Sequence, residues 1–430
     1  MYKRIFMALT ILLLALSASA SLAQDAPAEP VFAGVNAMGD LVIFGSDGII
    51  TVTNPSNRGL NSLVWSDDGT LLAYLMYDEN YQSRVMVTDG SGQTPQMLET
   101  GALEGGFPIT FTPDGNILYV QQGVFPSDAS APYQSQLMQI APTVGAQPSV
   151  VGTITYSVGC GGGSPYPADW QYTSASGGFG GSFLVLEWTD YGILYSVNCA
   201  GFGLALFDPN TGEARALTPD AFSALSDPAP QSVYGRARLS ADGSAVVGIR
   251  SQLGQDLLFT LYTADLATGT ITDIPSSHMP EQAGWGPDGS VVYMTREQVS
   301  NLTANLTAEQ SAALEQVFGG PMDVPAYQTS IYQVNVATGE ETQLYSEYAY
   351  AVGRMTLTND GRGLLFTTIP NMDAWVAGLV DGSLDVLNDM DGSAQRATVA
   401  VNLFLLPLNT GEPAGFVSMI EQFALRPTSS

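Results

Sequence analysis

The sequence predicts an all-β protein, because one unit of strand, tight turn and strand recurs along most of its 430 residues. The first copy is WSDDGTLLAY at residues 65–74, in which alternating apolar residues flank an Asp-Gly pair. Asp-Gly between two such segments is a strong signal for a hairpin turn. Further copies occupy residues 111–120, 239–248, 285–294 and 357–366, and a looser one occupies residues 187–196.

Each copy supplies an aspartate and a glycine to its turn. Glycine tolerates the positive φ angle that such turns need, and aspartate accepts hydrogen bonds from the nearby backbone. We therefore assign a structural role to ten turn residues: Asp68, Gly69, Asp114, Gly115, Asp242, Gly243, Asp288, Gly289, Asp360 and Gly361.

A second family of turns follows most copies and completes a four-stranded unit. It contains Thr-Gly and lies at residues 206–213, 264–270, 334–340 and 408–412. Four-stranded sheets that recur every 40–50 residues are typical of a β-propeller. A row of β-sandwich domains of about 100 residues each would not reuse one hairpin at half that spacing.

The repeats predict a single propeller with seven blades, and six blades are the alternative. Six hairpin copies are visible, and residues 31–55 resemble the outer strands of a further blade. Together with residues 396–425 they would form a composite blade, which joins the two chain ends and closes the ring.

The motif W/F-S/T-x-D-G-x-x-L/V-x-Y, followed by I/L-Y-x-x-D/N-x-x-T-G, resembles the TolB-type repeat, also described as WD40-like or PD40. The resemblance covers roughly residues 31–425 and implies a propeller. TolB itself carries a separate α/β domain before its propeller. Because repeat-like strands begin near residue 31, we expect that domain to be lacking.

The first 23 residues are predicted to be a signal peptide. Lys3 and Arg4 precede an apolar run from Ile5 to Leu16, and Ser21-Leu22-Ala23 fits a cleavage site. We expect a linker at 24–30, the propeller at 31–425 with long insertions at about 153–183 and 297–326, and a tail at 426–430. The apolar run is too short for a comfortable membrane span, so the protein is predicted to be exported, to a periplasm or outside the cell, without a membrane span.

The chain is strongly acidic, with 41 Asp and Glu against 13 Lys and Arg. Removing the signal peptide leaves 11 basic residues, all arginine. Binding to nucleic acid needs a basic surface, so the charge argues against that class of partner. We expect a monomer whose partner is another protein, a peptide or a glycan.

Two cysteines, Cys160 and Cys199, are present. In an exported protein this number favours one structural disulfide. The alternative, a metal or redox pair, lacks CxxC spacing and histidine partners. We expect no cofactor and no metal.

Catalytic patterns are lacking. His278 is the single histidine, its neighbours suggest a loop between blades, and the chain has no G-x-S-x-G elbow followed by a histidine. The chain without its signal peptide contains no lysine, which excludes Schiff-base catalysis. Asp389-Met390-Asp391-Gly392 is only a fragment of a calcium-binding loop. Carboxylates paired in space cannot be recognised from sequence, so a carboxylate enzyme stays an alternative.

Two insertions are the candidate functional segments. The first, residues 156–183, mixes glycine with four aromatic residues that would suit a ligand-contact loop or cover their own blade: Tyr166, Trp170, Tyr172 and Phe179. The second contains the one short helix we predict, at residues 308–318, with Thr307 and Gln310 as a capping box. Its apolar stripe would be Leu306, Leu314, Val317 and Phe318.

These observations favour an exported, non-catalytic propeller that binds a protein, peptide or glycan in the cell envelope or outside the cell. The alternative is a propeller enzyme, a hydrolase or lyase, that uses carboxylates and a metal in its central channel.

Overall fold

A computed structural model provides the coordinates of the chain. It describes residues 31–427 except 37–38, 46–47, 53–59, 79, 81, 93, 104–106, 124–132, 157–184, 198–202, 220, 223–231, 253–257, 305, 319, 321–323, 349, 370–371, 385–400, 409–410 and 419. The predicted signal peptide therefore lies outside the described residues, and its cleavage stays a prediction.

Seven four-stranded antiparallel sheets, the blades, make up the described part of the chain. Blade 1 has the order β28 (Ile420–Leu425), β1 (Phe32–Asn36), β2 (Leu41–Gly45), β3 (Gly48–Val52). Blade 2 has β4 (Leu60–Trp65), β5 (Leu71–Tyr77), β6 (Ser83–Asp89), β7 (Gln96–Met97), and blade 3 has β8 (Thr110–Phe111), β9 (Ile117–Gln121), β10 (Tyr133–Ile140), β11 (Ser149–Tyr156).

The remaining blades keep the same order. Blade 4 has β12 (Leu186–Thr189), β13 (Gly192–Ser196), β14 (Leu204–Asp208), β15 (Glu213–Ala216), and blade 5 has β16 (Ser232–Leu239), β17 (Ala245–Gln252), β18 (Leu258–Asp265), β19 (Ile271–Ile274). Blade 6 has β20 (Gln282–Trp285), β21 (Val291–Asn301), β22 (Pro325–Val334), β23 (Glu341–Tyr348), and blade 7 has β24 (Tyr350–Leu357), β25 (Gly363–Ile369), β26 (Asn402–Pro407), β27 (Ala414–Ser418).

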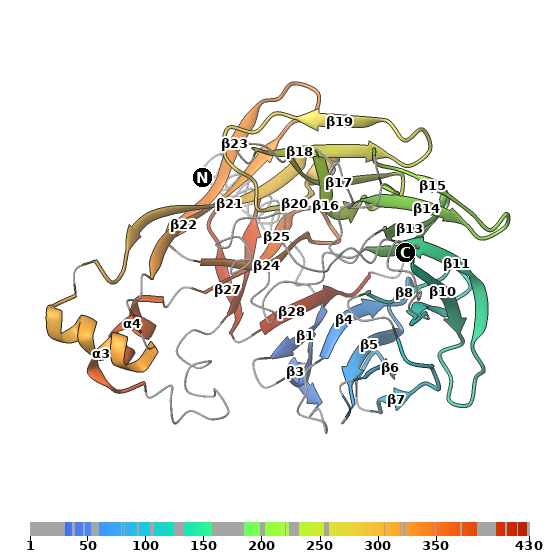
Figure 1. Cartoon of the computed structure of the whole chain (residues 1–430), viewed down its shortest axis with the longest axis horizontal. Helices are drawn as coiled ribbons and strands as arrows, with labels where there is room; N and C mark the ends of the chain where they lie inside the picture. The colour runs from blue at the N-terminus through green and yellow to red at the C-terminus, as the bar shows by residue number, and fades with distance from the viewer. Residues whose placement is uncertain are drawn as a thin grey trace, which may run out of the picture.

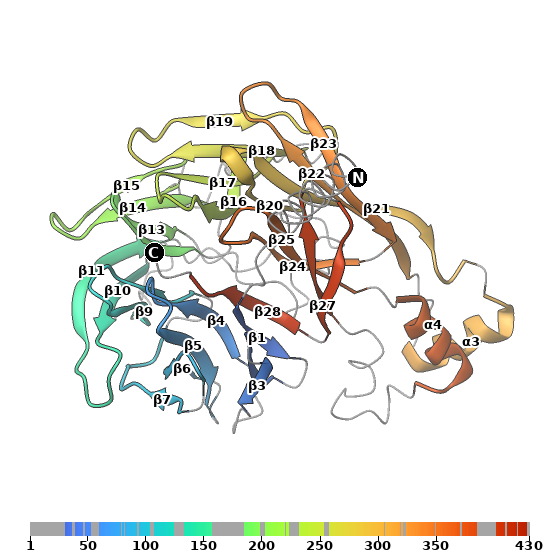
Figure 2. The same ribbon diagram turned by 180° about the vertical axis from the view of Figure 1, so that it is seen from behind.

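The blades form a ring, as Figures 1 and 2 show from opposite sides. Their first strands, β28, β4, β8, β12, β16, β20 and β24, are the inner strands, and contacts join β28 to β4, β4 to β8, β8 to β12, β16 to β20, β20 to β24 and β24 to β28. The predicted seven-bladed propeller is confirmed, and the six-bladed alternative is wrong.

The closing blade is composite, but its share of the C-terminal segment is smaller than expected. Only β28 pairs with β1, whereas β26 and β27 complete blade 7. The difference arises because blade 7 carries an insertion between its second and third strands, which moves its outer hairpin toward the C-terminus.

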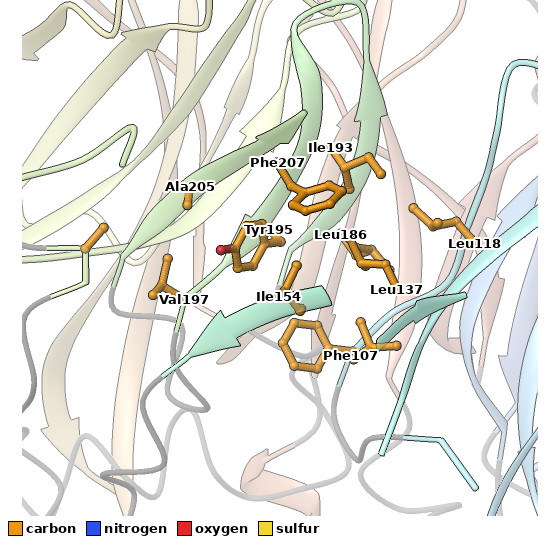
Figure 3. Close-up of a cluster of buried hydrophobic side chains, with 12 residues drawn as sticks. Phe107, Leu118, Leu137, Ile154, Leu186, Ile193, Tyr195, Val197, Ala205 and Phe207 are labelled. Carbon is orange, nitrogen blue, oxygen red and sulfur yellow. The ribbon is translucent and has the colours of Figure 1, made fainter. Parts of the chain in front are cut away.

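The hydrophobic core lies mainly between neighbouring blades. Figure 3 shows one such cluster, in which Leu118 and Ile154 of blade 3 face Ile193, Tyr195 and Phe207 of blade 4. A Cβ atom on Gly152 would lie 2.1 Å from the Phe207 ring, so only glycine permits this approach of the two blades. Because each blade buries its faces against its neighbours, no blade is stable alone.

The Asp-Gly pairs form the turns between the first and second strands of their blades. The five glycines of the close repeat copies have φ angles between 66° and 76°. In blade 6 the turn is a 3-10 helix, η1 (Pro287–Gly289), in which Asp288 also has a positive φ of 56°.

Two helices occur among the described residues, whereas the sequence predicts one. The expected helix is α3 (Ala308–Phe318), and the additional one is α4 (Met372–Asp381). Gly378 lies inside α4 and lowers the helix propensity of this segment, so the helix is difficult to recognise from the sequence. Val376, Leu379 and Val380 have helical spacing and would have indicated it.

Candidate functional site

The ring has two chemically different faces. One end of each antiparallel blade carries the turn between the first and second strands and the turn between the third and fourth strands. We call the face of the ring formed by these ends the turn face. Connections between second and third strands lie at the other end, the insertion face. Both helices belong to it, because α3 joins β21 to β22 and α4 joins β25 to β26.

A helical arm extends from the insertion face of blades 6 and 7, and we define it as residues 297–328 and 372–384. Its base is an elongated hairpin, in which β21 and β22 have 11 and 10 residues and remain paired as far as Asn301 and Pro325. The helices lie beyond the ring, at its edge in Figure 1.

The arm has a small hydrophobic core of its own. Five buried side chains form it, with Leu302, Leu306 and Val380 packed against them: Leu314, Val324, Val376, Leu379 and Leu384. The predicted stripe is thus confirmed for Leu306 and Leu314, whereas the side chains of Val317 and Phe318 lie outside the described residues. Leu314 of α3 packs in this core with Val376 and Leu379 of α4.

Local hydrogen bonds fix both helices. The backbone N–H of Thr307 donates to Gln310 Oε1 at 2.8 Å, and the N–H of Gln310 donates to Thr307 Oγ1 at 3.2 Å, which confirms the capping box. The Tyr348 hydroxyl of blade 6 donates to Asp373 Oδ1 in the first turn of α4 at 3.3 Å. Burial, together with the nearby Asp373 carboxylate, raises the pKa of Tyr348.

The surface of the arm is acidic. Its sequence contains no Lys or Arg, and the exposed carboxylates among its described residues are Glu297, Glu309, Glu315, Asp373 and Asp381. At its base, Arg296 Nη2 lies 2.8 Å from Glu281 Oε1 with both side chains largely buried, and the guanidinium lies 4.9 Å from the Tyr327 ring centroid. That arginine is part of the structural core, so the arm presents negative charge to solvent.

The inner strands surround the ring axis, where an enzyme of the alternative class would place its carboxylates. Glu187 of β12 is partly buried there, and the Thr110 hydroxyl of β8 donates to its Oε2 at 3.2 Å. Glu421 lies on β28. No group of three or more His, Cys, Asp or Glu within the described part of the chain is placed to hold a metal ion.

His278 lies in the connection between β19 and β20, as the sequence suggested. Its ring stacks on Tyr332 with centroids 4.5 Å apart, and Tyr332 stacks on Tyr293 at 5.3 Å. The Tyr293 hydroxyl donates to Glu341 Oε2 at 2.6 Å, and burial and that carboxylate raise the pKa of Tyr293. These contacts hold the connection between blades 5 and 6 against blade 6, which is a structural role.

The turn face carries aspartates whose bonds are made within their own turns. Asp68 Oδ1 accepts from the Ser66 hydroxyl at 2.7 Å and from the N–H and hydroxyl of Thr70. Asp242 accepts from Ser240 and Ser244 in the same way. These bonds lower the pKa of Asp68 and of Asp242 to about 2. Such turns stabilise the repeat and need no ligand.

The first predicted site lies outside the described residues. This holds for the aromatic residues Tyr166, Trp170, Tyr172 and Phe179 and for both cysteines, Cys160 and Cys199. Their roles as a ligand-contact loop and as a disulfide stay predictions.

No protein-family model and no curated protein matches this sequence. Solved structures similar to it include TolB from Acinetobacter baumannii, with 12% identity, a TM-score of 0.41, and coverage of 93% of this chain and 66% of that chain. The seven sheets built on the repeats decide the fold class. The fold is a seven-bladed β-propeller.

The similar solved structures also include enzymes. An oligogalacturonate lyase from Vibrio parahaemolyticus has 11% identity and a TM-score of 0.47, and the match covers 78% of this chain and 87% of that chain. The tricorn protease has 9% identity and a TM-score of 0.43, with coverage of 88% and 33%. These likenesses concern the fold alone. Both described helices, with 11 and 10 residues, are too short to cross a bilayer.

Proposed function

We propose that this chain is an exported, non-catalytic propeller that binds a protein or peptide partner through its insertion face. The helical arm carries the proposal. Ring closure depends on the inner strands and the composite blade, whereas the arm packs its helices on each other and extends past the ring. Binding residues commonly lie on segments that project from a rigid scaffold.

The charge of the arm supports a partner with a basic surface. Five carboxylates on the described part of the arm are exposed to solvent, and the arm sequence contains no basic residue. Complementary charge raises association rates and excludes acidic competitors, and the effect weakens as salt is added. A glycan partner would use the aromatic loop at 156–183 instead.

The test is cross-linking and capture from envelope extract with three forms of the mature chain. One is the wild type, and one is a Glu309→Gln, Glu315→Gln, Asp381→Asn variant. The control neutralises three exposed acids elsewhere by Asp67→Asn, Asp190→Asn and Glu213→Gln. We expect the wild type and the control to capture the same partner and the arm variant to lose it. Capture by the wild type should weaken at high salt. Equal capture by all three forms would show that the carboxylates of the arm do not contribute to partner binding.

Glu187 motivates a second candidate, a carboxylate enzyme at the ring axis. Its test is metal analysis of the purified protein together with hydrolase and lyase assays on wild type and Glu187→Gln. Activity or a bound metal that Glu187→Gln abolishes would favour the enzyme over the binding scaffold. A metal-free protein without activity in these assays would count against it.

A further inference from the structure

The outer strand of blade 1, β3, has an open edge. In the described part of the chain it pairs only with β2, from Leu41↔Val52 to Gly45↔Gly48, and this pairing has no register shift. Along the other edge of such a strand, backbone N–H and C=O groups are available to a further strand. Figures 1 and 2 show β3 at the periphery of the ring.

The other outer strands have features that hinder pairing with a further strand. Proteins protect the edges of their sheets with short strands, bulges and charged side chains. β7 has two residues, and the pairing of β11 and of β27 shifts register. Charged residues lie on β15, β19 and β23: Glu213, Arg215, Asp273, Glu341 and Glu347. As far as the structure describes the seven outer strands, β3 alone has none of these three kinds of protection.

The residues of β3 favour strand pairing. Its sequence is Gly-Ile-Ile-Thr-Val, with four consecutive β-branched residues and neither a charge nor a proline. Segments of this composition readily pair with further strands. Ile49 is 56% exposed and Thr51 is also exposed, whereas Ile50 and Val52 pack against the core between blades 1 and 2. The strand therefore keeps two β-branched side chains in solvent beside its open edge.

We infer that β3 pairs with β3 of a second copy of this chain, so that the protein forms a two-fold symmetric dimer. In an antiparallel pair of identical strands, both copies use the same backbone groups, and every contact occurs twice. A pairing centred on Ile50 places Ile49 opposite Thr51 of the partner subunit. Cross-strand pairs of this kind stabilise a sheet.

The charge of the chain favours a second copy over a basic segment of another protein. With 41 acidic and 13 basic residues, two copies repel each other wherever their acidic surfaces meet. Like charges directly opposite each other destabilise a strand pair, and the two glutamates of β23 would cause this repulsion there. β3 contains no charged residue, so two copies can approach at this strand. A basic segment would find no opposite charge on β3 and is better suited to the acidic arm.

The inferred dimer differs from the monomer expected from the sequence. It is independent of partner binding by the arm, because the arm belongs to blades 6 and 7 and β3 belongs to blade 1. Failure of one proposal would therefore leave the other intact.

The experiment is sedimentation velocity of the mature chain over a range of protein concentrations. The variant is Thr51→Lys, and the matched control is Thr272→Lys, which makes the same change at an exposed threonine of β19, the outer strand of blade 5. We expect the wild type and the control to dimerise with similar dissociation constants, below about 100 µM. Thr51→Lys should raise this constant at least 10-fold, because lysine on an edge strand prevents pairing. If Thr51→Lys does not fold, Ile49→Lys changes the other exposed position of β3.

Hydrogen exchange identifies the surface that the dimer uses. The amides of residues 48–52 should exchange more slowly in concentrated than in dilute wild type, and Thr51→Lys should abolish this difference. Wild type that stays monomeric at about 100 µM would overturn the inference. So would a dimer that Thr51→Lys weakens no more than Thr272→Lys does. Slower exchange in β3 only when another protein is added would also overturn it, because the strand would then pair with a foreign segment.

Discussion

The indole N–H of Trp65 donates a hydrogen bond to the backbone carbonyl of Ala424 at 3.1 Å, although 359 residues separate the two in sequence. Trp65 ends the inner strand of blade 2, and Ala424 lies on β28, the C-terminal inner strand of blade 1. The same bond recurs between Trp285 of blade 6 and the Arg238 carbonyl of blade 5 at 3.0 Å. Repeat tryptophans thus connect neighbouring inner strands, and one of these bonds closes the ring.

Trp65→Phe tests this closure. The variant keeps most of the apolar volume but removes the donor, and we expect the free energy of unfolding to fall by about 1–2 kcal/mol. Trp285→Phe is the matched comparison at an ordinary blade junction and should cost a similar amount. Urea denaturation measures both, and no loss in either variant would show that the indole bonds contribute nothing to the ring.

Two tyrosines at equivalent positions of the repeat should differ in how the free energy of unfolding changes when the hydroxyl group is removed. Tyr119 and Tyr293 both lie four residues after the turn glycine and are fully buried. The Tyr119 hydroxyl has no hydrogen-bond partner among the described residues, whereas Tyr293 donates to Glu341 at 2.6 Å. We expect Tyr293→Phe to destabilise the protein by about 1–3 kcal/mol, and Tyr119→Phe to be neutral or stabilising. Equal losses in urea denaturation would contradict this.

Acid should weaken the turn face. Because hydrogen bonds hold the pKa of Asp68 and Asp242 at about 2, below the usual value of about 3.9, the folded chain binds fewer protons than the unfolded chain between these values. The stability from these turns is present above pH 4 and is lost as the pH falls toward 2. Thermal unfolding of Asp68→Asn and Asp242→Asn should therefore depend less on pH in this range than the wild type.

The control for the acid prediction is Asp67→Asn, which changes the exposed neighbour of Asp68. Asp67 is not the acceptor of the bonds from Ser66 and Thr70. We expect its pH profile to follow the wild type. A profile as flat as that of Asp68→Asn would assign the effect to general charge reduction instead.

The ring could be predicted from sequence because its determinants are local and repeated. Asp68-Gly69 and its copies specify turns from within a few residues, and their spacing gives the four-stranded unit. The arm could be predicted only in part. A capping box in the local sequence marks the start of α3, whereas α4 is stabilised by contacts with α3, which is distant in sequence. The register shifts between β16 and β17 and between β24 and β25 could not be predicted, because register depends on the partner strand, which sequence patterns do not reveal.

The arm should unfold locally without opening the ring. Leu379 is buried in the core between α3 and α4, so Leu379→Ala should expose the amides of both helices to faster hydrogen exchange. The main thermal transition should stay where it is, because that core is separate from the ring clusters. Leu364→Ala in blade 7 is the comparison, and loss of this fully buried side chain should cost the ring about 2–5 kcal/mol. A main transition lowered equally in both variants would show that arm and ring unfold together.

The disulfide between Cys160 and Cys199 is the last prediction. Cys160 follows β11, which ends at Tyr156, and Cys199 follows β13, which ends at Ser196. Both strands end at the insertion face, on the neighbouring blades 3 and 4. We expect mass spectrometry of the exported protein to find one bridged peptide pair and no free thiol. Removing the bridge by Cys160→Ser with Cys199→Ser should cost about 3–4 kcal/mol, because the unfolded chain regains the freedom of a closed loop. Reduction of the wild type should lower its stability to that of the double variant, whereas two reactive thiols in the untreated exported protein would contradict the bridge.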